Sequence, residues 1–76
     1  MQKKQRRRIR IASNQLKLST GEVLRQQVVE IQSGVVVKYY PLQEELPQTE
    51  WWSGLILLNQ ENDGTMTAYY NGKRIE

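Results

Sequence analysis

The stretch VLRQQVVEI at residues 23–31, the pair SG at 33–34 and the stretch VVVKYY at 35–40 decide the fold of this 76-residue chain. Both outer stretches are rich in β-branched and aromatic residues, which favour strands. The pair Ser33-Gly34 separates them at the spacing of a tight turn, and glycine accepts the positive φ that such turns need. The sequence therefore predicts a β-hairpin at this place.

Strand patterns continue on both sides of the hairpin. Residues 8–11 and 15–18 alternate polar and apolar side chains, which is typical of strands with one wet face, and we expect a turn at Ser13-Asn14 between them. Pro41 ends the hairpin because proline has no N–H to donate to a ladder. Further strands are predicted at residues 55–58, 65–70 and 73–76, with turns at 62–64 and 71–72.

The one stretch without a strand pattern is residues 41–50, where Leu42 and Leu46 have the spacing of a single helical turn. Helical content should otherwise be close to nil. The predicted fold is all-β: a curled antiparallel or mixed sheet of five to seven short strands, forming a small sandwich or partial barrel. Its core should come from residues 9 and 11, 28–31, 35–37 and 55–58. A basic, partly disordered leader at 1–8 should precede a single β domain at 9–76.

The chain contains neither histidine nor cysteine. Without imidazole, no side chain titrates near neutral pH by default, and the commonest ligand for transition metals is missing. Without a thiol there is no thiolate nucleophile, cysteine metal site or disulfide. Most routes to catalysis are closed, so we expect a non-catalytic protein without cofactor or metal.

The small size of the chain also suggests that it binds a partner. A domain of this length buries only about 60% of the surface that its unfolded chain exposes, so its core is marginal. Disulfides and metals are the usual additions, and the composition excludes cysteine-based ones. The remaining sources of stability are the packing of Trp51, Trp52 and the tyrosine pairs, or burial against a partner. We therefore expect a homo-oligomer or a protein partner.

Positive charge is concentrated at the N-terminus, where six of the eleven basic residues lie within the first ten positions: Lys3, Lys4, Arg6, Arg7, Arg8 and Arg10. Residues 11–76 carry five basic residues against all eight acids, a formal charge of −3. The leader could bind phosphates of nucleic acid. The alternative is a solvated terminus that runs into an edge strand guarded by charge, and the leader lacks the aromatic residues that nucleic-acid binders present. No apolar run suits a membrane span or signal peptide, so we expect a cytoplasmic protein.

Trp51 and Trp52 follow a segment with three carboxylates, at Glu44, Glu45 and Glu50. A general acid and base in an aromatic cleft would use such residues but would also need an enclosing pocket. A structural interpretation has one Trp closing an open end of the core and the other at its rim. If both rings are exposed, they form a patch suited to a protein partner.

The tyrosine pairs at 39–40 and 69–70 place one ring on each face of a strand, because neighbouring side chains point in opposite directions. We expect one tyrosine of each pair in the core. The outward rings could stack on bases, although aromatic residues are also simply good strand formers.

The first half of the chain resembles the small N-terminal β domain, or composite domain, of metal-dependent amidohydrolases. The matching residues are Ile9, Ile11 and Ala12, then the segments 21–24 and 29–36, with 54–57 as a returning strand. The resemblance implies a β fold. It carries over no catalytic residue, because the His-x-His motif that follows in that family has no counterpart here. Residues 41–51 are also similar to a segment of short uncharacterised bacterial proteins, to which no function attaches.

These observations predict a small interaction or structural module that self-associates, with Trp51, Trp52, Glu50 and Tyr40 as contact residues. The alternative is a nucleic-acid binder that uses the basic leader. A third hypothesis is an accessory remnant of an amidohydrolase-like protein.

Overall fold

A computed structural model describes residues 8–44 and 46–76, and this part of the chain is all-β, without a helix. Its six strands are β1 (Arg8–Lys17), β2 (Val23–Gln32), β3 (Val35–Pro41), β4 (Glu50–Gln60), β5 (Met66–Tyr70) and β6 (Lys73–Arg74). They confirm the predicted fold class.

All six strands belong to one sheet in the order β3-β2-β1-β4-β5-β6. Strand β1 is antiparallel to β2 and parallel to β4, so the sheet is mixed. The predicted hairpin is confirmed: β2 and β3 pair antiparallel, and Pro41 is the last residue of β3. The interpretation of the first strand as an edge strand is wrong, because β1 lies between β2 and β4.

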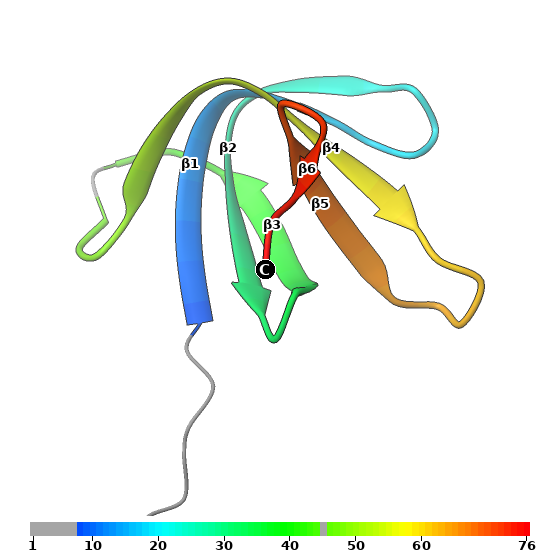
Figure 1. Cartoon of the computed structure of the whole chain (residues 1–76). Coiled ribbons are helices and arrows are strands. Elements are labelled where there is room, and N and C mark those ends of the chain that lie inside the picture. Colours follow the sequence, from blue (N-terminus) through cyan, green and yellow to red (C-terminus); the bar gives the residue numbers. More distant parts are fainter. Residues whose placement is uncertain (1–7, 45) are drawn as a thin grey trace, which may run out of the picture.

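The predicted turn at Ser13-Asn14 is also wrong, because β1 continues through it as a bend. The register of β1 against β4 shifts between Ser13 and Gln15, which marks a β-bulge. Gly54 of β4 has a φ of 112°, and its N–H donates to Oδ1 of Asn14 at 2.7 Å. In β2, Gln26 has a φ of 51° beside the same place. Bulges increase the bend and twist of strands, so three neighbouring strands change direction together and the sheet curls into a half-barrel (Figure 1).

The hydrophobic core fills the inner face of the half-barrel. Its buried members are Ile11, Leu16, Val29, Ile31, Val36, Ile56, Leu58, Ala68 and Ile75. The four segments predicted to build the core all contribute, but they also contain the exposed Val37 and Leu57. Leu57 is exposed because β4 alternates between its two faces, whereas the run of apolar residues predicted a strand buried on both.

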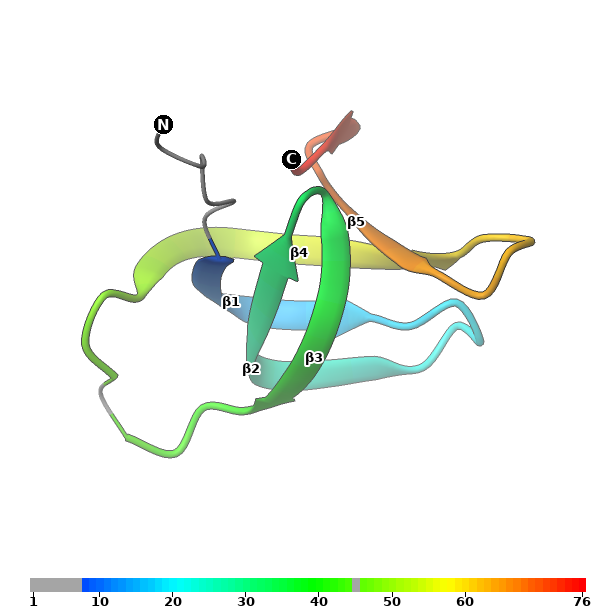
Figure 2. The ribbon, with the colours of Figure 1, turned by 90° about the horizontal axis from the view of Figure 1, so that it is seen from below.

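The two ends of the sheet approach each other on the inner side (Figure 2). The guanidinium of Arg74 in β6 donates to the carbonyl of Gly34, in the turn between β2 and β3, at 3.0 Å. The N–H of Ile75 donates to the carbonyl of Ala68 at 2.8 Å. These bonds hold the C-terminal residues over the open side of the core.

Residues 42–44 and 46–49 form the connection from β3 to β4 and contain no helix, so the predicted helical turn is wrong. The connection is tied to the sheet instead. Leu42 N–H donates to the carbonyl of Gln26 at 2.9 Å, and the guanidinium of Arg10 donates to the carbonyl of Pro47 at 2.9 Å. In the described ranges, no helix is long and apolar enough to cross a membrane.

Candidate functional site

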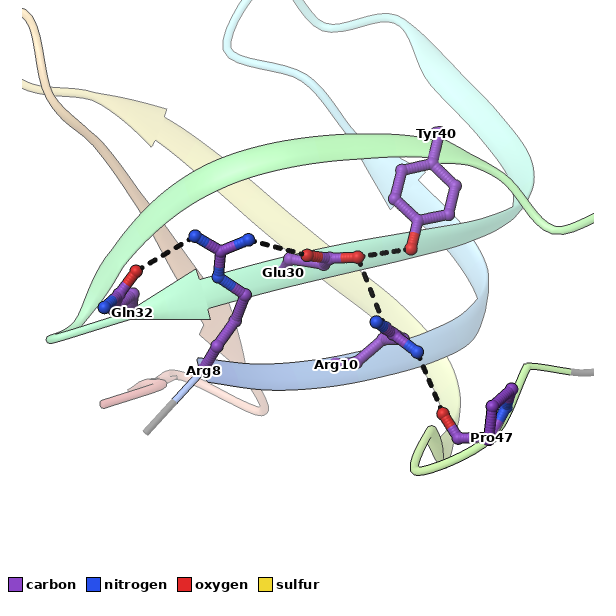
Figure 3. A network of polar contacts seen from close by, with 6 residues as sticks. All are labelled: Arg8, Arg10, Glu30, Gln32, Tyr40 and Pro47. Atoms are coloured by element: carbon purple, nitrogen blue, oxygen red, sulfur yellow. Dashed lines mark hydrogen bonds and ion pairs between the residues drawn. The ribbon is translucent and has the colours of Figure 1, made fainter. Parts of the chain in front are cut away.

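A carboxylate network occupies the outer face of β1, β2 and β3. Glu30 of β2 keeps only 3% of its side chain exposed. Its carboxylate accepts from Arg8 at 3.4 Å, from Arg10 at 3.2 Å and from the hydroxyl of Tyr40 (Figure 3). The register explains the cluster, because Arg10 lies directly opposite Glu30 in the ladder of β1 and β2. A buried charge is tolerated only with such partners.

The network shifts the acidity of two of its members. Burial by itself raises the pKa of Glu30, but the hydrogen bond from Tyr40 and the charges of Lys38, Arg10 and Arg8 together outweigh it, so this pKa lies below its ordinary value. The pKa of Tyr40 is raised, first by burial and then by its hydrogen bond to Glu30 and the negative charge there. Glu30 is therefore ionised and Tyr40 neutral over the physiological range, as a structural cluster requires.

Of the basic residues predicted to bind nucleic acid, Arg8 and Arg10 are drawn into this network. Arg8 also donates to the side chain of Gln32 at 3.1 Å. The other four, Lys3, Lys4, Arg6 and Arg7, lie outside the described residues.

The two tryptophans lie on opposite faces of β4 and do not form a common patch. Trp52 packs against the core, with its ring 5.0 Å from that of Tyr70, and its indole N–H donates to Glu50 at 3.0 Å. Trp51 keeps 48% of its surface exposed. This is the arrangement expected from the structural interpretation, with one ring closing the core and one at its rim.

Trp51 stands beside a hollow on the outer face. The hollow is lined by Trp51, by Ala12, which pairs with it in the ladder, and by Leu42, Leu46 and Pro47 of the β3–β4 connection. The rest of the lining is polar: Gln26, Gln43, Glu44, Thr49 and Glu50. An exposed indole next to a depression of mixed character is a candidate contact surface, since Trp is enriched at interface hot spots.

Two of the three carboxylates that the sequence places near the tryptophans lie in the described structure. Glu44 and Glu50 both line the hollow beside Trp51, and both are exposed; Glu45 lies outside the described residues. Within residues 8–44 and 46–76, no cluster of three or more acidic residues could hold a metal ion.

Of the four predicted contact residues, Trp51 and Glu50 are exposed, whereas Trp52 and Tyr40 are half-buried. The hydroxyl of Tyr40 is bonded to Glu30 and its ring lies 5.5 Å from the ammonium of Lys38. Trp52 and Tyr40 therefore have structural partners within the chain, and Trp51 is the residue with most apolar surface to offer.

A second, larger hollow opens at the end of the half-barrel, and sequence reasoning missed it. It brings Trp52 and Tyr70 together with Arg8, Lys73 and Arg74. These residues come from β1, β4, β5 and β6, so no short sequence pattern marks them as neighbours.

One tyrosine of each pair was expected in the core, and Tyr39 and Tyr70 do pack against it.

Comparison with protein-family models, curated proteins and solved structures gives no match for this chain.

Proposed function

We propose that this protein is a non-catalytic interaction module that self-associates through the face of β4 that carries Trp51. The observation that supports the proposal most is the exposed indole beside a hollow that offers apolar contacts from Ala12, Leu42 and Leu46. The polar lining of the same hollow includes Gln43 and Glu44. A projecting ring and a depression on the same face are self-complementary. A two-fold axis beside them lets the Trp51 of each copy enter the hollow of the other.

The exposed ring of Trp51 would be one anchor within a larger interface, since specific interfaces bury about 1,200–2,000 Å² in total. Full burial of a tryptophan side chain removes about 150–250 Å² of surface from water. The 48% of Trp51 that is still exposed therefore corresponds to about 100 Å² that a partner can bury. At about 25 cal/mol per Å² this is about 2.5 kcal/mol per copy and about 5 kcal/mol per symmetric dimer. Loss of both rings should raise the dissociation constant by about 3.5 orders of magnitude, since each 1.4 kcal/mol is about tenfold.

The test is the mass of the full chain by light scattering over a range of concentrations. We expect a mass that rises above the monomer with concentration, and a monomer for Trp51→Ser. Leu57→Ser is the matched control, because Leu57 is a 40% exposed apolar residue of the same strand, away from the hollow. Dissociation by the control as well as by Trp51→Ser would locate the contact elsewhere.

The alternative functions stay predictions. Arg8 and Arg10 already bind Glu30, so nucleic-acid binding by the basic leader would depend mainly on Lys3, Lys4, Arg6 and Arg7. The accessory role in an amidohydrolase-like protein rests on the strand and turn pattern alone. The cytoplasmic location likewise rests on the sequence.

A further inference from the structure

The hollow at the open end of the half-barrel has the chemistry of a phosphate-bearing ligand site. Its volume is about 1540 Å³, and it lies on the side of the sheet opposite the exposed Trp51. Lys73 and Arg74 of β6 line it on one side, and Arg8 at the start of β1 lines it on the other. Four strands, β1, β4, β5 and β6, thus bring cations and aromatic rings to one place.

The charge balance of the hollow favours an anion. Arg8, Arg10, Lys73 and Arg74 contribute four cations to its lining, against two carboxylates. Glu30, behind Arg8 and Arg10, offsets part of their charge. Lys73 and Arg74 form no ion pair within the described residues, and the guanidinium of Arg74 donates to the neutral carbonyl of Gly34. The charge of Arg74 also acts on Glu61, whose pKa it helps to lower.

Two acidic residues, Glu50 and Glu76, also line the hollow. Glu50 accepts the indole N–H of Trp52, and Glu76 follows Arg74 by two residues. The two carboxylates reduce the positive charge of the lining but do not cancel its four cations.

The aromatic part of the lining determines which anion fits. Trp52 and Tyr70 both line the hollow, with ring centroids 5.0 Å apart and planes tilted by 50°. Tyr70 is held by a hydrogen bond from its hydroxyl to the carbonyl of Ser53. Fixed aromatic rings within a basic groove are what unpaired bases stack on, whereas the bases of a duplex remain stacked on one another.

We propose that this hollow binds single-stranded nucleic acid, with Lys73 and Arg74 at its phosphates and Trp52 as the ring on which a base stacks. The basic residues Lys3, Lys4, Arg6 and Arg7 precede Arg8 in the sequence and lie outside the described residues, so the proposed site does not include them. The site differs from the predicted leader site, because its specific contacts come from β4 and β6. It uses Trp52, and not Trp51, as its aromatic contact, although Thr49 and Glu50 line both hollows.

The first test is a titration of the full chain with a thymidine oligonucleotide, followed by tryptophan fluorescence. We expect quenching, and Trp51→Phe should retain it because the signal comes from Trp52. Single-stranded oligonucleotide should bind more tightly than the duplex of the same length. If about four basic groups meet phosphates, affinity should fall about 50-fold between about 50 and 200 mM salt.

The second test separates the hollow from unspecific charge. Lys73→Glu should weaken binding and lower the magnitude of the salt slope by about 0.7, the share of one phosphate contact on a single strand. Lys17→Glu is the matched control: Lys17 is an exposed lysine of β1 that does not line the hollow, and its reversal changes the net charge equally.

Two outcomes would overturn the proposal. Equal losses for Lys73→Glu and Lys17→Glu, with no quenching of Trp52, would mean that overall charge alone holds the oligonucleotide. Absence of binding at low salt would exclude nucleic acid as the ligand.

Discussion

Replacing Glu30 with Gln tests whether the outer-face network stabilises the sheet. The variant keeps the shape of the side chain and removes the charge that Arg8, Arg10 and Tyr40 share. Breaking a fully buried ion pair costs about 3–5 kcal/mol. Here Arg8 and Arg10 are 49% and 32% exposed, so water replaces part of what each guanidinium loses. We expect the free energy of unfolding to fall by about 2 kcal/mol, near the value for a hydrogen bond to a charged group.

Urea denaturation at neutral pH measures this loss. Glu22→Gln is the control, because Glu22 is exposed in the turn between β1 and β2 and its replacement should change stability by less than about 0.5 kcal/mol. The pH dependence gives a second reading. Since the pKa of folded Glu30 is lowered, its contribution is present above the unfolded pKa of 4.5 and is lost as pH falls through the folded value. The difference between wild type and Glu30→Gln should therefore shrink in acid. Equal stability of the two at pH 7, or a difference that pH leaves unchanged, would refute the reasoning.

Two smaller perturbations test other parts of the same account. Tyr40→Phe removes the hydroxyl that donates to Glu30 and should lower the free energy of unfolding by about 1.5 kcal/mol, measured by urea denaturation. Because the pKa of folded Tyr40 is raised, the wild type should also lose stability as pH rises above 10. A Phe variant with the same loss of stability at alkaline pH would contradict this origin. Gly54→Ala places a side chain at a φ of 112°, which alanine adopts only under strain, so we expect a thermal midpoint several degrees lower, whereas an unchanged midpoint would show that the bend does not need glycine.

The elements that could be predicted from sequence are those with local signals. The hairpin of β2 and β3 and the strands after residue 54 follow from β-branched runs and glycine turns, which act over a few residues. The bend at Asn14 could not be distinguished from a turn, because the same polar residues serve both. What decides for a bend is the bond from Gly54, forty residues away in the chain.

The site was predictable in part for the same reason. The alternation of side chains along a strand predicts that Trp51 and Trp52 point to opposite faces. The apolar run at residues 55–58, however, suggested that both faces of this strand are buried. Glu30 stands alone among Val28, Val29 and Ile31, and a lone acid in such a strand is a signal that its partners lie across the sheet. Lys73 and Arg74 gave no signal, since only the curl of the sheet brings β6 to the start of β1.

The emission of Trp51 as a function of protein concentration tests the central claim most directly. In a Trp52→Phe chain, Trp51 is the only indole, and its exposed ring should emit at long wavelength when the protein is dilute. The account predicts a shift to shorter wavelength as copies associate, because the ring then leaves water for the hollow of a second chain. Emission that stays at long wavelength while the mass of the protein rises would contradict it.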